Sequence, residues 1–209
     1  MKPSSFLPFL IFTGCVATQY RPALTTHLSP HTIPARVRID QFEDLSPANE
    51  RKRKALATSA TAPGSLDGDL TQGVVNALLT DFEINQVFSS IQKTPSDNVD
   101  LVLKGKIHRF YGHAGASYLT WLTLPVDLLW YLNLPVFRNR GVVEIEIDAF
   151  TPDGNKLGNY RGRSQFSIWH GPYTHSFHGI GAKLNRAFSQ CILEIRAQML
   201  KDAAKLAKK

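Results

Sequence analysis

The chain has 209 residues, a length that suits one domain with a sizeable core. Its 24 Lys and Arg outnumber its 17 Asp and Glu, and the cations gather in the run 51–54 and in the C-terminal tail. Neither cluster carries interleaved aromatic residues of the kind that stack on bases, so the composition argues against a nucleic-acid partner and favours solvated charge.

The N-terminus predicts a signal peptide over residues 1–14. Lys2 precedes the apolar run 6–12, which is too short to cross a bilayer as a permanent helix. Two small residues then precede Cys15. This ending, FTGC, resembles the lipobox of bacterial lipoproteins, in which a signal peptidase cuts before the cysteine and the thiol receives a diacylglycerol. An ordinary secreted start with a chance cysteine is the alternative.

The lipobox resemblance implies that Cys15 is lipidated and that its acyl chains, palmitate among them, anchor the mature protein to a membrane. Val16 follows, where an Asp would signal retention, so the resemblance points to the outer membrane and a domain that faces the periplasm. Cys191 is the second cysteine of the chain, and with Cys15 as a thioether no disulfide forms within one chain.

The start of the mature chain predicts a tether, a strand and a loop. Residues 15–34 are rich in Thr, Pro, His and Ala without a period, which is typical of a tether. A single domain is expected over 35–209. Its first strand is predicted over 35–42, where apolar and charged residues alternate, and the polar stretch 44–64 predicts a loop.

A helix is predicted over residues 67–82, because its apolar residues recur four apart. Ser65 or Asp67 can cap its N-terminus, and Asp69 suits the positive end of the helix dipole.

Four further strands are predicted over 86–92, 98–111, 141–151 and 157–169. The turn 152–155 reads PDGN, so the last two strands should pair antiparallel. In the strand 141–151 apolar residues alternate with acids. The acids predict a solvent-exposed face of the strand: Glu144, Glu146 and Asp148.

The chain closes with a predicted helix over 179–206. Its apolar stripe consists of Ile180, Leu184, Ala187, Phe188, Cys191, Ile195, Met199 and Leu206. Strands with one solvent-exposed face need helices to cover their other, apolar face. The fold class is therefore α+β: a two-layer sandwich, mostly antiparallel, with two helices on one face and an apolar insert over 117–137.

Two segments of the mature domain resemble segments of known envelope lipoproteins. Residues 99–110 (VDLVLKGKIHRF) and 141–162 (GVVEIEIDAFTPDGNKLGNYRG) resemble strands of small α+β lipoproteins in Gram-negative envelopes, such as those of lipopolysaccharide assembly and curli secretion. The resemblance is one of pattern over residues 35–205. It implies a lipid-anchored protein that assists envelope assembly or transport.

The insert 117–137 reads SYLTWLTLPVDLLWYLNLPVF and allows three interpretations. A transmembrane helix is disfavoured by Asp127 and by the two prolines. An apolar loop packed on its own domain is the second interpretation. The favoured one is an exposed contact for a membrane or a protein partner, because Trp and Tyr amid Leu suit such interfaces. Its candidate residues are Tyr118, Trp121, Leu128, Trp130 and Tyr131.

Three histidines in nine residues, His170, His175 and His178, could bind zinc together with His108 or His113. Helix-borne ligand spacing is missing and no acid lies within the segment, so a solvated loop is favoured and no metal or cofactor is predicted. The pair Glu144 and Glu146 could serve glycoside chemistry, but a solubilising strand face is commoner.

The favoured function is therefore non-enzymatic: a lipid-anchored periplasmic accessory lipoprotein that supports an envelope assembly or transport complex by binding protein or lipid. The alternative is a metal-dependent envelope enzyme that uses the loop of His170, His175 and His178.

Overall fold

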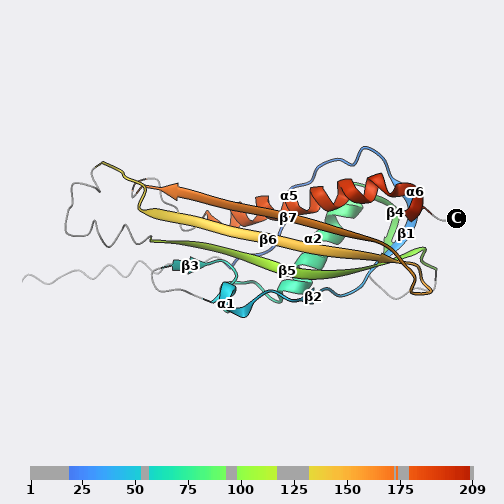
Figure 1. Ribbon diagram of the computed structural model, residues 1–209, viewed down its shortest axis with the longest axis horizontal. Helices are drawn as coiled ribbons and strands as arrows, with labels where there is room; N and C mark the ends of the chain where they lie inside the picture. The colour runs from blue at the N-terminus through green and yellow to red at the C-terminus, as the bar shows by residue number, and fades with distance from the viewer. Residues whose placement is uncertain are drawn as a thin grey trace, which may run out of the picture.

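The computed structural model describes residues 19–52, 57–92, 98–116, 132–171, 173 and 179–207. Its elements are β1 (Ile33–Ile39), β2 (Glu43–Asp44), α1 (Ala48–Arg51), β3 (Ala57–Ser59), α2 (Leu70–Ile84), β4 (Phe88–Gln92), β5 (Leu101–Ala116), β6 (Phe137–Phe150), β7 (Lys156–His170), α5 (Ile180–Lys201) and α6 (Ala203–Leu206). Figure 1 shows an elongated molecule in which β5, β6, β7 and α5 run along one axis. The predicted α+β class is confirmed.

Seven strands of the described chain form one open sheet in the order β4-β1-β5-β6-β7, with β2 and β3 also paired to β5. Three short strands share one edge of β5: β1 pairs with 101–103, β2 with 106–107 and β3 with 113–115. The sequence predicts a mostly antiparallel sheet, but β1 pairs in parallel with both β4 and β5. Helix α2 lies between β1 and β4 in the chain and provides the crossover that parallel pairing requires.

The hairpin of β6 and β7 confirms the antiparallel pair predicted from the PDGN turn. Its register runs from Phe137 opposite His170 to Phe150 opposite Lys156. The turn closes through a hydrogen bond from the Thr151 N–H to the Asn155 carbonyl at 2.9 Å. The strands are a few residues longer than predicted: β6 begins at Phe137 rather than at Gly141, and β7 runs from Lys156 to His170.

Helix α2 begins three residues later than predicted, and its cap differs. Asp69 is the N-cap, and its carboxylate accepts a hydrogen bond from the Gln72 N–H at 3.0 Å. The predicted caps were Ser65 and Asp67, but Asp67 instead forms an ion pair with Arg21 at 2.6 Å. The helix therefore starts where the carboxylate can reach an unpaired backbone N–H group.

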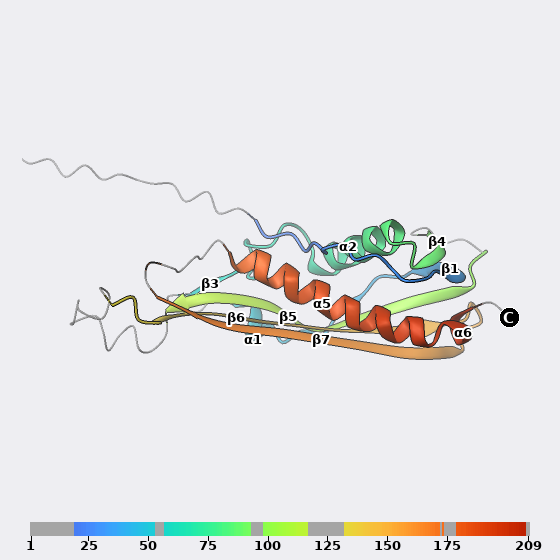
Figure 2. The ribbon, with the colours of Figure 1, turned by 90° about the horizontal axis from the view of Figure 1, so that it is seen from above.

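Helix α5 lies along β6 and β7, as Figure 2 shows from above. All eight residues of the predicted apolar stripe are buried. One apolar cluster joins these side chains to the inner face of the sheet and to α2. The predicted helix ends at Lys201 rather than at Leu206, because Asp202 interrupts it and α6 follows separately.

Helix α5 also covers part of the outer edge of β7. The Gln198 side chain accepts from the Arg161 N–H at 3.2 Å and donates to the Arg161 carbonyl at 2.8 Å. The Glu194 carboxylate accepts from the Arg163 N–H at 3.0 Å. These side chains take the place of a neighbouring strand, so this part of a long edge is closed to unwanted pairing.

Residues 44–64, predicted as a loop, contain ordered elements instead. Within the described part of this stretch, β2, α1 and β3 lie along β5, and Ala60 and Ala62 are buried. These elements are too short to leave a periodic pattern in the sequence, and their order comes from the edge of β5. No helix in the described part of the chain is long and apolar enough to cross a membrane.

Candidate contact surface

Most site residues that the sequence predicts lie outside the described residues. These are Cys15, Tyr118, Trp121, Leu128, Trp130, Tyr131, His175 and His178. The described part of the insert begins at Leu132. His170 is described, at the end of β7.

Exposed apolar side chains gather where β5, β6 and β7 approach the insert. We call this end the tip and define it by residues 112–116, 132–143, 164–171 and 173 (left in Figure 1). Eight large apolar side chains are exposed in the described chain, and five belong to the tip: Leu132, Leu134, Ile168, Trp169 and Tyr173. Such a concentration is typical of a contact surface, because isolated exposed apolar residues are normally scattered.

Arginines lie among these apolar side chains. Arg138 and Trp169 are opposite each other on β6 and β7, with the guanidinium carbon 5.2 Å from the ring centroid. The Arg138 Nε also donates to the Ser167 hydroxyl at 3.0 Å. Arg140, two residues further on the same face of β6, is exposed. A cation held over an indole ring gives this face both an apolar and a charged component.

The charge on the described tip is entirely positive. No Asp or Glu occurs in its residues or in the first half of α5, residues 179–193. The same segments carry Arg138, Arg140, Lys183 and Arg186. In the sequence, the positive charge of the tip corresponds to a long stretch without Asp or Glu around Arg138 and Arg140. The composition of the whole chain does not reveal this local absence of acids.

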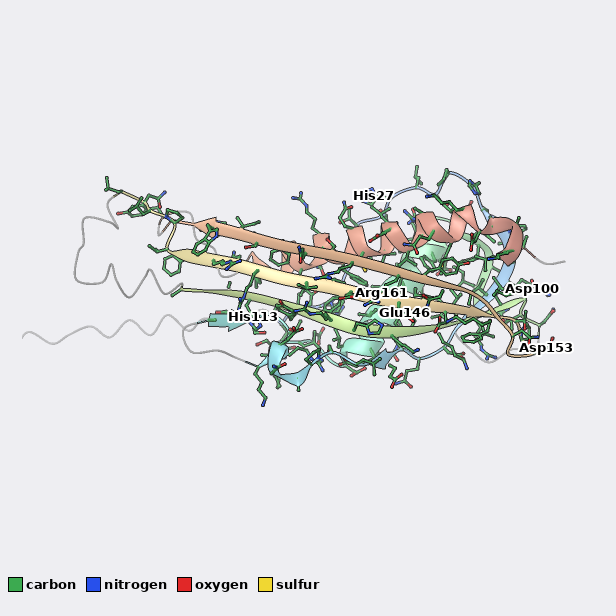
Figure 3. All side chains as sticks on the ribbon, in the orientation of Figure 1. His27, Asp100, His113, Glu146, Asp153 and Arg161 are labelled. Atoms are coloured by element: carbon green, nitrogen blue, oxygen red, sulfur yellow. The ribbon has the colours of Figure 1, made fainter. Side chains whose placement is uncertain are left out.

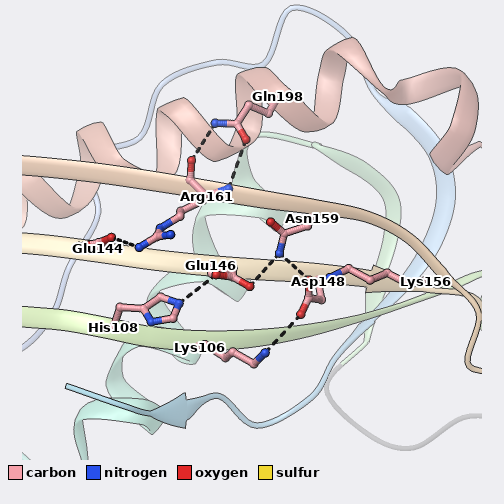
Figure 4. Close-up of polar contacts among 9 residues, drawn as sticks. All are labelled: Lys106, His108, Glu144, Glu146, Asp148, Lys156, Asn159, Arg161 and Gln198. Atoms are coloured by element: carbon pink, nitrogen blue, oxygen red, sulfur yellow. Dashed lines mark hydrogen bonds and ion pairs between the residues drawn. The ribbon is translucent and has the colours of Figure 1, made fainter.

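Away from the tip, the same open face of the sheet carries paired charges (Figure 4). The acids of β6 were predicted to lie on a solvent-exposed face, but Glu144 and Asp148 are both only 6% exposed. Glu144 pairs with Arg161 and, at 3.9 Å, with Arg163. The prediction was wrong because long side chains from the neighbouring strands lie over these carboxylates.

Asp148 and Glu146 complete this row of acids. Lys156 lies 2.6 Å and Lys106 3.7 Å from the Asp148 carboxylate. Burial alone raises the pKa of Asp148, but hydrogen bonds from Lys156 and Asn159 outweigh it and lower the pKa. The pKa of Glu146 is likewise lowered, because its hydrogen bonds outweigh burial. Hydrogen bonds, with two lysines at Asp148, favour the ionised form of both carboxylates, which suits a structural ladder of polar contacts better than a proton donor for glycoside chemistry.

The described histidines lie at separate places on the molecule. His170 Nε2 lies 3.0 Å from the Lys183 Nζ and accepts a hydrogen bond from its ammonium group. Burial, and then the nearby Lys183, lower the pKa of His170. His108 contacts Glu146 at 2.9 Å, and His113 contacts the Glu50 carbonyl.

Figure 3 labels His113 toward the tip and Glu146, the partner of His108, further along the sheet. Among the described residues, no three potential metal ligands come together. A zinc ion bound through Nε2 of His170 would have to displace Lys183 from that nitrogen.

The residues that precede β1 pack on the domain, although the sequence predicts a tether over 15–34. We call residues 19–32 the N-terminal strap. Asn185 of α5 accepts from the Tyr20 hydroxyl at 2.8 Å and from the Ala23 N–H at 3.0 Å. The Thr25 N–H donates to the Ser189 hydroxyl at 2.8 Å. Polar side chains of α5 therefore hold a segment that has no periodic pattern of its own.

The chain folds as an elongated α+β protein in which basic and exposed aromatic side chains gather at one end. No family model and no curated protein matches the chain. Solved structures with some similarity include protein XCC0632 of Xanthomonas campestris, of family model DUF330, at 11% identity and a TM-score of 0.48 over 88% of this chain and 99% of that one.

Two others are the PelC dodecamer of Paraburkholderia phytofirmans and lipoprotein GNA1162 of Neisseria meningitidis. PelC is 9% identical over 91% of this chain and 95% of its own, with a TM-score of 0.37. GNA1162 is 11% identical over 77% and 99%, with a TM-score of 0.34. At these values the similarities assign no family to the chain.

Proposed function

We propose that the chain is a lipid-anchored accessory lipoprotein of the outer membrane that faces the periplasm. It supports an envelope assembly or transport complex by binding protein or lipid at its tip. The observation that carries this proposal is the group of exposed apolar side chains there, which come from the end of the apolar insert and from the end of β7 and the residues after it. The FTGC ending supports the anchor, because it resembles a lipobox at Cys15.

The anchor is tested by Cys15→Ser, which removes the thiol that would carry the lipid. We expect the variant to leave the membrane fraction or to remain as an unprocessed precursor, and to lose labelling by radioactive palmitate. Cys191→Ala is the matched control, because this buried thiol should not affect lipidation. If Cys15→Ser matures and sediments with membranes like the wild type, the anchor is refuted.

The contact surface is tested by Trp169→Glu, which places a carboxylate among the exposed apolar residues of the tip. Complexes crosslinked in intact cells are purified from membranes with each variant. We expect Trp169→Glu to lose an associated envelope component that the wild type retains. Ile84→Glu is the control, because Ile84 is 58% exposed at the end of α2 and outside the tip. Equal losses in both variants would contradict a specific role for the tip.

A further inference from the structure

Only five residue steps separate Cys15 from Tyr20, where the N-terminal strap becomes fixed. Tyr20 is 8% exposed, and its N–H donates to the Ser65 carbonyl at 2.8 Å. Its hydroxyl donates to Asn185 of α5, also at 2.8 Å. A fully extended chain covers at most about 3.5 Å per residue, so Cys15 lies within about 17 Å of Tyr20.

Tyr20 is fixed near the end of α5 that is closer to the tip. A Cβ atom at Gly181 would lie 3.0 Å from the Tyr20 ring. From Gly181 to Lys201 the helix advances about 30 Å, at 1.5 Å per residue. The residues between Cys15 and Tyr20 cannot cover that length. An anchor on Cys15 therefore stays near the tip half of the molecule, where Figure 2 shows the strap begin.

The surface of the tip, as defined above, matches an anionic membrane. Arg138 and Arg140 point to the open face of the sheet, and on the opposite side of the sheet the first half of α5 carries the exposed Arg186 and no acid. Anionic headgroups attract such cations. Trp169 stacks with Arg138, and tryptophan prefers the boundary between headgroups and acyl chains.

We propose that the tip docks on anionic lipid headgroups of the same leaflet that holds the acyl chains of Cys15. Arg138 and Arg140 contact lipid phosphates, and Trp169 lies at the boundary with the acyl chains. The proposal rests on the proposed function through the anchor at Cys15. The long axis of the molecule then points away from the membrane, and the turn 152–155 is held furthest from it.

The test follows the contact between Trp169 and lipid in the complete lipidated protein. Trp121→Phe and Trp130→Phe leave Trp169 as the single tryptophan. The protein is reconstituted in vesicles with about one-third phosphatidylglycerol or with phosphatidylcholine alone, both with acyl chains brominated near the headgroup. We expect bromine to quench Trp169 fluorescence in the anionic vesicles, and 0.5 M salt to reverse the quenching because it screens the charges.

Charge variants identify the surface. Each arginine near an anionic membrane strengthens binding by about fivefold, so Arg138→Gln with Arg140→Gln should shift the ratio of docked to undocked protein about 25-fold and abolish quenching. The control, Lys104→Gln with Lys201→Gln, removes the same charge from exposed residues far from the tip and should leave quenching intact.

Three outcomes overturn docking on lipid. They are equal quenching in both vesicle types, equal effects of both charge variants, and shielding of Trp169 that requires an added envelope protein or a second copy of the chain. Flotation separates these outcomes from failure of the anchor. If the protein does not float with vesicles at all, the proposed function fails. If it floats but Trp169 is not quenched, only the docking proposal fails.

Discussion

At the scale of single residues, Arg196 connects three parts of the molecule. Its side chain and that of Asp81 are each 4% exposed, and their charged atoms lie 3.3 Å apart. Arg196 also donates to the His27 carbonyl of the N-terminal strap at 2.6 Å, and Asn85 donates to Asp81 at 2.8 Å. The pair therefore joins α5, α2 and the strap. Arg196 is not among the apolar residues of the predicted stripe, and its burial comes with these partners.

Arg196→Met should destabilise the protein strongly. The variant leaves the Asp81 carboxylate buried without its cation, and breaking a buried pair in this way costs about 3–5 kcal/mol. Urea unfolding at pH 7 measures the loss. Arg196→Met combined with Asp81→Asn should lose less than Arg196→Met alone, because no uncompensated charge remains.

The effect of Arg196→Met should also depend on pH. Burial raises the pKa of Asp81, and Arg196 partly opposes this shift. A raised pKa in the folded state means that folding gains from protonation at low pH and loses that gain as the pH rises through the folded pKa. Without Arg196 the pKa rises further, so the gap in unfolding free energy between variant and wild type should narrow from pH 7 toward pH 5. A constant gap would show that Asp81 is not the cause.

At the scale of elements, α5 performs two tasks: it buries the inner face of the sheet and it covers the edge of β7. Leu184 and Ile195 are fully buried on its apolar stripe. Gly162 of β7 lies against the backbone of α5, where a Cβ atom would stand 2.2 Å from the Cys191 carbonyl oxygen. The helix thus approaches the strand as closely as a residue without a side chain allows.

Leu184→Ala and Ile195→Ala should each lower the free energy of unfolding by about 2–5 kcal/mol, as truncations in a core do. Gln190→Ala, on the exposed side of α5, is the control and should stay within about 0.5 kcal/mol of the wild type. Urea denaturation measures all three. Losses near zero for both core variants would mean that α5 does not stabilise the sheet.

Gly162→Ala should cost about 1–3 kcal/mol, because the new methyl group forces the helix away from β7. Gly112→Ala is a matched comparison on β5. There a Cβ atom would meet the Ile180 side chain at 3.3 Å, and a side chain can move more easily than a backbone carbonyl. Thermal unfolding should therefore rank Gly162→Ala below Gly112→Ala in stability, and the reverse order would contradict the close approach.

At the scale of the whole molecule, the distribution of charge follows the long axis. The open face of the sheet carries paired acids and bases around Glu144 and Asp148, whereas the tip carries cations and exposed apolar side chains. The insert leaves the sheet at this same end, between β5 and β6. The ion pairs and the exposed apolar side chains thus lie at different places along one sheet.

Trp121→Glu combined with Trp130→Glu tests the insert, which lies outside the described residues between 117 and 131. We expect the double variant to fold normally but to associate more weakly with lipid or with its protein partner, because two carboxylates oppose burial of the rings. Circular dichroism with thermal melting checks the fold, and membrane fractionation after high-salt washing checks association. If the domain unfolds instead, the stretch belongs to the core and the contact interpretation fails.

Local patterns were sufficient to predict the hairpin of β6 and β7 and the helix α5. Alternation over residues 141–151 and the PDGN turn specify an antiparallel pair, and a stripe at helical spacing specifies a buried face. Both signals arise between residues that are close in the chain. The ends of these elements were less well predicted, because a strand continues for as long as a neighbour supplies hydrogen bonds.

The features that the sequence did not predict depend on contacts between residues that are far apart in the chain. Burial of Glu144 and Asp148 depends on cations from β5 and β7, and alternation reports only that the two faces of a strand differ. The order of β2, α1 and β3 comes from the edge of β5, and that of the strap from α5. The sequence alone determined the candidate lipid anchor at Cys15. Only the tertiary structure brought the arginines and exposed aromatics to one end and fixed the strap nearby. Arg138 meets Trp169 across two paired strands, and Tyr20 bonds to Asn185, which lies 165 positions away, so local patterns in the sequence report neither contact.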